Sequence, residues 1–202
     1  MADIPGIIII GDHPIMLEGL AAFFVKTGRW NVKGTAASLE EAKKLLAVTH
    51  ADIVLIDIQL EDGWGLDIIP WYEKEKPNDA KPVMAVYSSY DDCAHVRTAV
   101  SLGVQAYITK RRSDKELENA LLKALAGEKY IDEAAHYNLA GSNSKLILLT
   151  KREMEMLTLA KQKKSNKEIA AELGISYRTV ENTLSCVYDK TGVNSRYELQ
   201  LL

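Results

Sequence analysis

The sequence predicts an α/β domain with a doubly wound, five-stranded parallel sheet, followed by a small all-α domain of four helices. The chain has 202 residues, which exceeds one typical domain of about 100–150 residues. Short apolar runs alternate with helical patterns through the first part of the chain, and such alternation indicates a parallel sheet with helices on both faces. The last part of the chain contains helical patterns alone.

Five apolar runs are the predicted strands of the sheet. The first consists of four consecutive isoleucines, the pattern of a strand buried on both faces. The runs cover residues 7–10, 30–34, 51–57, 82–87 and 106–109.

Capping signals mark the helices that connect these strands. Ser38, with Glu41 three residues later, has the pattern of a capping box for a helix that ends near residue 48. A helix is predicted from about residue 65, and Pro70 is expected to kink it. Another helix is expected over residues 91–102, and Ser113 is the predicted cap of the last helix.

Two further capping boxes are predicted in the C-terminal part, at Thr150 with Glu153 and at Ser165 with Glu168. Gly174 breaks the second of these helices, and Ser176 has the character of an N-cap for the next. Two short helices joined by a glycine-containing turn form a helix-turn-helix arrangement. The pattern alone fits a purely structural helical hairpin equally well.

The charge of the chain is divided unevenly. The formal net charge is −3, but residues 1–144 hold 15 basic and 21 acidic side chains, and residues 145–202 hold 10 basic and 7 acidic ones. The basic C-terminal part suggests a nucleic-acid partner. The change of sign falls at residues 140–144, which have the small polar composition of a linker.

Composition also indicates the compartment. No apolar run approaches the roughly 18 residues that a membrane-spanning helix needs. The two cysteines, Cys93 and Cys186, form no disulfide framework, which is typical of a reducing compartment. We therefore expect a cytoplasmic protein that does not associate with a membrane.

Polar residues lie at or just after the ends of four of the predicted strands: Asp12, Asp57, Ser88 and Lys110. Ligands of parallel sheets bind at the carboxyl ends of the strands, so these side chains are expected to meet in one crevice. Two carboxylates can hold Mg²⁺, and a carboxylate can act as a nucleophile toward a phosphoryl group. An ammonium and a hydroxyl can bind the phosphoryl oxygens.

The N-terminal part resembles the flavodoxin-like receiver domain of two-component response regulators. The resemblance rests on residues 11–14 (GDHP), Asp57, 65–66 (GL), 88–89 (SS) and 103–110 (GVQAYITK). It implies that Asp57 is the phosphoacceptor, that Asp12, Asp57 and the backbone carbonyl of Gln59 hold Mg²⁺, and that Ser88, Tyr107 and Lys110 are the phosphoryl-binding and switch residues. A plain core aromatic is the alternative for Tyr107.

Two positions depart from the receiver pattern. Gly11 stands where the family usually carries the first of two adjacent acids, and Glu61 stands where it commonly has proline. The loss of an acid at position 11 removes one negative charge and one outer metal contact. We therefore expect weaker Mg²⁺ binding.

The C-terminal part closely resembles the LuxR-type DNA-binding domain. The matching stretches are residues 149–153 (LTKRE), 165–173 (SNKEIAAEL), 175–176 (IS), 179–180 (TV) and 192–196 (GVNSR). Together with the receiver pattern, they identify the chain as similar to the NarL/FixJ class of response regulators. The implied domains are a receiver at 1–127, a linker at 128–146 and a helix-turn-helix domain at 147–202.

The resemblance also implies that the helix from Tyr177 enters the major groove of DNA. Glu181 is unusual on this helix, because it repels phosphates unless it accepts a hydrogen bond from a base. The residues expected to contact DNA are Lys167, Tyr177, Arg178, Thr179, Glu181, Asn182, Ser185 and Lys190.

These observations predict a transcription regulator and not an enzyme. A sensor histidine kinase is expected to phosphorylate Asp57, and this modification is expected to control homodimerisation and promoter binding. Gly11 leaves open a phosphate-independent receiver that acts through dimerisation or protein docking. Glu181 leaves open a protein-interaction module that has lost DNA binding.

Overall fold

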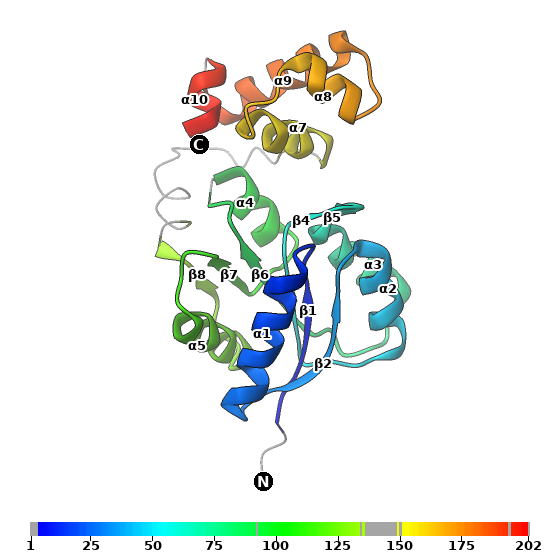
Figure 1. The fold of residues 1–202 in the computed structure, drawn as a ribbon, viewed down its shortest axis with the longest axis vertical. Coiled ribbons are helices and arrows are strands. Elements are labelled where there is room, and N and C mark those ends of the chain that lie inside the picture. The colour runs from blue at the N-terminus through cyan, green and yellow to red at the C-terminus, as the bar shows by residue number, and fades with distance from the viewer. Residues whose placement is uncertain are drawn as a thin grey trace. The chain divides into compact units, whose positions relative to one another are not determined.

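A computed structural model describes residues 4–91, 93–133, 135, 149, 151–193 and 195–201. The chain divides into two units, with most of residues 1–137 in the first and residues 138–202 in the second. Figure 1 shows the sheet in the first unit and the C-terminal helices in the second.

The first unit is built on a parallel sheet with the strand order β2-β1-β3-β6-β7-β8. This arrangement confirms the predicted fold class. The sheet has six strands instead of five, because β8 adds two residues at the edge next to β7. The strands are β1 Gly6–Ile10, β2 Asn31–Ala36, β3 Ile53–Ile56, β6 Val83–Ser88, β7 Ala106–Thr109 and β8 Tyr130–Ile131.

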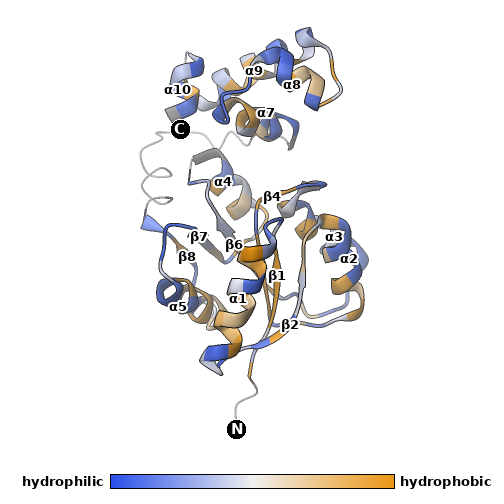
Figure 2. Ribbon diagram, in the orientation of Figure 1, coloured by the Kyte–Doolittle hydropathy of each residue, from blue (hydrophilic) through white to orange (hydrophobic). Residues whose placement is uncertain are grey.

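Helices cover both faces of this sheet. Alternate residues of β1, Ile7 and Ile9, belong to the core cluster that also contains apolar residues of α1 and α5. Ile8 and Ile10 are equally buried on the opposite face. Figure 2 shows β1 as a hydrophobic strand inside the unit. The helices are α1 Pro14–Thr27, α2 Leu39–Val48, α3 Ile68–Glu75, α4 Cys93–Ser101 and α5 Asp114–Leu125.

The predicted kink at Pro70 is wrong. A short 3₁₀ turn, η1 Gly65–Asp67, comes first, and α3 then begins at Ile68. Pro70 therefore lies in the first turn of α3, where a backbone N–H has no partner within the helix and its loss costs little.

Two features of the first unit were not predicted. One is an antiparallel hairpin formed by β4 Gln59–Leu60 and β5 Gly63–Trp64, directly after Asp57. The other is a cluster of hydrogen bonds that holds β8 to the sheet. The buried carboxylate of Asp132 accepts hydrogen bonds from Thr109 Oγ1 at 2.5 Å and from Arg112 Nε at 2.8 Å.

The second unit contains the four predicted helices, α7 Lys151–Lys161, α8 Asn166–Glu172, α9 Tyr177–Thr191 and α10 Arg196–Leu201. Ser165 and Glu168 form the expected capping box, and Ser176 caps α9. Gly174 has a φ of 62°, which suits glycine in the turn between α8 and α9. The predicted cap at Thr150 lies outside the described residues.

Candidate functional site

Asp57 is the centre of the polar site at the carboxyl end of the sheet. It directly follows β3, and its backbone N–H donates to Ile10 O at 2.9 Å, which fixes it beside the end of β1. Its side chain is buried and accepts a hydrogen bond from Lys110 Nζ at 2.5 Å. Lys110 is positioned by its own N–H, which donates to Ser88 O at 2.9 Å. The structure thus brings together the ends of four strands, as the sequence predicted.

The surroundings of Asp57 act on its charge in opposite directions. Burial raises the pKa of this carboxyl, and the nearby charge of Asp12 raises it further. Lys110 and the backbone N–H of Gln59 lower the pKa of Asp57, but the net direction is upward. The folded protein therefore stabilises the negative charge of ionised Asp57 less well than water does. Such an environment favours a bound cation.

Asp12 and His13 lie beside Asp57. Ligand atoms of these three side chains all lie within 4.8 Å of one another. His13 Nδ1 contacts Asp12 Oδ1, and the imidazole is largely exposed. Carboxylate oxygens of Asp12 and Asp57 are the donors that Mg²⁺ prefers, so the residues present fit the metal that receiver domains bind.

A tyrosine connects the remaining site residues. Tyr90 Oη donates to Gln59 Oε1 at 2.6 Å, and Tyr90 N donates to Ser88 Oγ at 3.2 Å. Tyr107 is fully buried, and its hydroxyl donates to Tyr90 O at 2.6 Å. Tyr90, in the segment after β6, therefore contacts three predicted site residues. They are Ser88, Tyr107 and Gln59, the last of which lies in the hairpin after Asp57.

Two glycines shape the backbone around the site. A Cβ on Gly65 would lie 1.9 Å from Asp57 O, so a side chain at this position is incompatible with the observed backbone. A Cβ on Gly11 would lie 2.7 Å from Met16 Cε, the mobile end of a flexible side chain. Position 65 thus requires glycine for close approach, whereas position 11 could accept a side chain if Met16 shifted.

The second unit presents a polar face on α9. Val180, Leu184 and Val187 are buried, as the sequence predicted. The rest of the helix surface carries the exposed residues Tyr177, Arg178, Thr179, Glu181, Asn182 and Ser185. Lys167 is exposed on α8.

Two of the residues expected to contact DNA have partners within the unit. Lys190 Nζ donates to Glu153 Oε2 at 2.7 Å, an ion pair that ties α9 to α7. Thr179 Oγ1 hydrogen-bonds Ser176 Oγ at 2.8 Å at the start of α9. The structure thus gives Lys190 and Thr179 structural contacts in addition to their predicted role.

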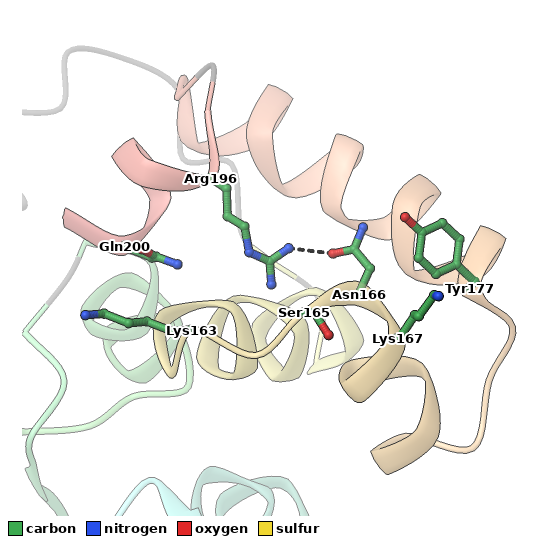
Figure 3. A pocket seen from close by; sticks show the side chains of 7 residues that line it. All are labelled: Lys163, Ser165, Asn166, Lys167, Tyr177, Arg196 and Gln200. Atoms are coloured by element: carbon green, nitrogen blue, oxygen red, sulfur yellow. Dashed lines mark hydrogen bonds between the residues drawn. The ribbon is translucent and has the colours of Figure 1, made fainter.

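A pocket of about 560 Å³ lies between α8, α9 and α10 (Figure 3). Lys167 and Tyr177, both predicted to contact DNA, line it together with Lys163. Arg196 also lines the pocket, but its guanidinium donates to Asn166 Oδ1 and to Lys164 O. This arginine therefore holds the start of α10 against α8, while Lys163 and Lys167 add positive charge to the face.

Comparison with known proteins gives a family match for each of the two units. Residues 7–122 match the response regulator receiver domain, and residues 148–202 match the luxR family of bacterial regulatory proteins. The chain is 31% identical over 203 residues to YhcZ, an uncharacterized transcriptional regulatory protein of Bacillus subtilis (strain 168), with 96% of this chain and 93% of that protein covered. It is 28% identical over 197 residues to the transcriptional regulatory protein LiaR of the same strain, with 94% and 92% covered.

Among solved structures, the chain is similar to RcsB from Salmonella enterica serovar Typhimurium bound to promoter rprA in the presence of phosphomimetic BeF3⁻. The TM-score is 0.72 at 22% identity, with 98% of this chain and 97% of that chain covered, and this likeness concerns the fold.

The fold and the matches define a class of protein, in which a receiver domain is followed by a LuxR-type DNA-binding domain. This chain belongs to that family of two-component response regulators and is a transcription factor. Within the described residues, no helix has the length and apolar character needed to cross a membrane.

Two residues near the site were not assigned to it from the sequence. His13 adjoins Asp12, but a single histidine at a predicted helix start is most simply read as a capping or surface residue. Tyr90 lies two residues after Ser88, and nothing in the sequence shows that its hydroxyl reaches Gln59. His13 lies near Asp57, and Tyr90 lies near Gln59, only because the chain folds, so no local sequence pattern assigns either residue to the site.

Proposed function

We propose that a sensor histidine kinase phosphorylates Asp57 and that this modification controls homodimerisation and promoter binding. The buried carboxylate of Asp57, 2.5 Å from Lys110 Nζ and beside Asp12, is the observation that carries the proposal. We further propose a receiver at 1–127, a linker at 128–146 and a DNA-binding domain at 147–202, in a cytoplasmic protein. The family matches over 7–122 and 148–202 support these boundaries.

Asp12, Asp57 and the backbone carbonyl of Gln59 are the proposed holders of Mg²⁺. When bound, this ion supplies positive charge that offsets the phosphoryl oxygens near the carboxylates. The carboxylate oxygen of Asp57 forms the new bond to phosphorus, the P–N bond of the kinase phosphohistidine breaks, and the histidine imidazole is the leaving group.

Phosphorylation would change the partners of Lys110 and Ser88. A phosphoryl group brings about two negative charges to Asp57. Lys110 already contacts the carboxylate and would pair with the phosphoryl oxygens, and the Ser88 hydroxyl would donate to one of them. Because Tyr90 contacts both Ser88 and Tyr107, a movement of Ser88 would be transmitted to the aromatic switch residue.

The output is proposed to be promoter recognition by α9 in the major groove. We propose that the DNA backbone is contacted by Lys167, Tyr177 and Arg178. The edges of the bases are proposed to be contacted by Asn182 and Ser185. Thr179, Glu181 and Lys190 complete the proposed interface, with the internal hydrogen bonds of Thr179 and Lys190 fixing the helix start and end. A homodimer would present two such helices to two half-sites.

The experiment combines a phosphoryl donor with the full-length protein and measures incorporation of label. With acetyl phosphate and Mg²⁺, the natural protein should become labelled, whereas Asp57→Asn should not. Asp79→Asn is the matched control, because Asp79 is an exposed carboxylate of the same unit. The same samples are then measured for dimerisation and binding to promoter fragments. Absence of label would contradict phosphorylation as the input.

Gly11 supports a second candidate, a receiver that works without phosphate. The site lacks one carboxylate that the family usually has, so dimerisation or protein docking could replace phosphorylation as the input. Equal promoter binding by the natural protein incubated with acetyl phosphate and Mg²⁺ and by Asp57→Asn under the same conditions would favour this function.

The exposed Glu181 on α9 supports a protein-interaction module as a third candidate. DNA binding that depends on phosphate contacts weakens steeply as salt is raised. Failure to bind promoter fragments at any salt concentration would favour this candidate.

A further inference from the structure

Helix α7 ends in a backbone conformation that usually requires glycine. Lys163 has a φ of 63°, which lies in the left-handed region. Among the residues that the structure describes, it is the one residue other than glycine with a positive φ. A side chain in this region is unfavourable, because its Cβ crowds the following carbonyl group. The chain therefore keeps a lysine where glycine would be accommodated more easily.

Other helix ends show that this turn does not itself need a lysine. Lys163 N donates to Ala160 O at 3.1 Å. Lys164 N donates to Leu159 O at 3.3 Å, and the two hydrogen bonds together form a Schellman motif. Helices α4, α5 and α8 end with the same pair of hydrogen bonds, and each has glycine at the left-handed position: Gly103, Gly127 and Gly174. The benefit of a lysine at position 163 therefore lies in its side chain.

The ammonium of Lys163 is available to bind a ligand. The side chain is exposed, and no hydrogen bond or ion pair joins its ammonium to another residue that the structure describes. The neighbouring Lys164 differs, because its Nζ pairs with Glu172. Strained backbone conformations are concentrated at functional sites. An unpaired ammonium on a strained backbone thus fits a binding role better than a role in stabilising the fold.

Lys163 lines the pocket of about 560 Å³ between α8, α9 and α10. Lys167 is also exposed, and Figure 3 shows the two lysines at opposite ends of this pocket. No carboxylate belongs to the lining in the described part of the chain. The acids of α8 have other partners, since Glu168 closes the helix cap and Glu172 pairs with a lysine outside the lining. The pocket therefore combines two separated positive charges with polar walls.

We propose that this pocket binds neighbouring phosphate groups, and that the left-handed turn at Lys163 positions one of the two cations for them. Lysine binds phosphate as a point charge. The volume lies within the range of about 300–1,000 Å³ that is typical of ligand sites. In the promoter complex the phosphates belong to the DNA backbone, and in this form the inference rests on the proposed function. A free polyphosphate presents the same chemistry.

Lys163→Gly in the full-length protein removes the cation and preserves the turn, since glycine suits a φ of 63°. Promoter fragments of different sequence should all bind more weakly. The slope of log K against log salt concentration should decrease by about 0.9, which amounts to an about eightfold loss of affinity between 1 M and 0.1 M salt. The variant should unfold at a temperature no lower than that of the natural protein, which excludes misfolding as the cause.

Lys164→Ala is the matched control, because it removes the same charge from the adjacent residue. The Lys164 ammonium pairs with Glu172 and does not line the pocket, so the salt slope should not change. A second arm titrates sodium triphosphate alone into the natural protein and into Lys163→Gly, with calorimetry as the readout. Weaker triphosphate binding by Lys163→Gly identifies a free polyphosphate as a ligand, whereas weaker binding of DNA alone identifies the DNA backbone.

The outcomes separate this inference from the proposed function. If the natural protein binds promoter DNA but Lys163→Gly keeps both its salt slope and its triphosphate affinity, the phosphate pocket is overturned and promoter recognition stands. Equal losses in Lys163→Gly and Lys164→Ala would also overturn the pocket, since they indicate net charge alone. If the natural protein binds no promoter fragment but binds triphosphate through Lys163, promoter recognition fails and the pocket stands. Absence of binding to both ligands contradicts both.

Discussion

Asp57, the proposed phosphoacceptor, is unfavourable for stability at neutral pH. Its carboxylate is buried, and burial raises its pKa more strongly than Lys110 lowers it. The stability that Asp57 contributes is therefore present in full below its ordinary pKa near 3.8 and is lost as the pH rises through the higher pKa of the folded protein. At neutral pH the folded chain holds a carboxylate that would be better solvated in the unfolded chain.

Asp57→Asn should consequently stabilise the protein at neutral pH. The amide has nearly the same shape and carries no charge, so the gain should be about 1 kcal/mol at pH 7 and should shrink toward pH 4. Urea denaturation at the two pH values measures it. Asp79→Asn, an exposed carboxylate, should change little, and a loss of stability in Asp57→Asn at pH 7 would contradict the expectation.

Gly65 and Gly19 form a matched pair for testing close packing at the site. A Cβ at position 65 would lie 1.9 Å from Asp57 O, whereas a Cβ at position 19 would meet nothing within 4 Å. Gly65→Ala should destabilise the protein by about 1–3 kcal/mol and disturb Asp57.

Gly19→Ala should do the opposite. Position 19 lies within α1, where alanine stabilises a helix by roughly 0.5–1 kcal/mol relative to glycine. Thermal unfolding measures the stability of both variants, and labelling of Asp57 by acetyl phosphate shows whether the site is disturbed. Equal effects of the two substitutions would show that the close approach to Asp57 O is unimportant.

At the scale of elements, β8 depends on one buried carboxylate. Asp132 accepts hydrogen bonds from Thr109 and Arg112, and its backbone N–H donates to Tyr107 O at 2.9 Å. Asp132→Ala should cost about 3 kcal/mol, because it leaves Arg112 and Thr109 without this acceptor. Hydrogen exchange at the N–H groups of residues 130 and 132, which donate to Gln105 O and Tyr107 O, should become faster, while exchange in the rest of the sheet should not change.

Glu133→Ala is the control for this element. The Glu133 side chain is 98% exposed and lies 3.9 Å from Arg112, so its removal should leave the exchange of β8 unchanged. Faster exchange in Glu133→Ala would mean that general charge loss, and not the buried hydrogen bonds, controls β8.

The elements also show which features a sequence reveals. Ile7 to Ile10 and the buried side of α9 repeat with the period of their secondary structure, and the capping pairs lie three residues apart, so local pattern was sufficient. Strand β8 has two residues and no periodicity, and its partner β7 is distant along the chain. Pro70 is ambiguous locally, because proline fits both a kink and a helix start.

The residues of the site also divide into those that a sequence pattern predicts and those that it does not. Four of the site residues lie at the ends of strands, and the rule for parallel sheets predicts from the sequence that they meet at one edge: Asp12, Asp57, Ser88 and Lys110. Tyr90 and His13 act through neighbours that depend on loop conformation. No spacing in the sequence encodes the Tyr90–Gln59 hydrogen bond.

At the scale of the whole molecule, the N-terminal part of the chain is acidic and the C-terminal part is basic. Residues 145–202 hold 10 basic and 7 acidic side chains, a small excess for a nucleic-acid-binding domain. If Lys167 neutralises a phosphate, Lys167→Ala should weaken binding to all promoter sequences. It should also reduce the slope of log K against log salt concentration by about 0.9 for each phosphate that is no longer neutralised.

Lys115→Ala removes the same charge from an exposed position on α5. Fluorescence anisotropy over a range of salt concentrations should show no change of slope for this variant. Equal changes in Lys115→Ala and Lys167→Ala would indicate an effect of net charge without a local interaction between Lys167 and a phosphate.

The sixth strand has a consequence for how the protein can be divided. β8 covers the backbone of β7, whose residues are all buried. A fragment that stops at residue 127 would expose the backbone groups at this apolar edge, which is a template for pairing with another chain. Such a fragment should self-associate, whereas one that continues through Asp132 should stay monomeric at the same concentration. The two residues of β8 thus protect the edge of the sheet beside β7 from pairing with another chain.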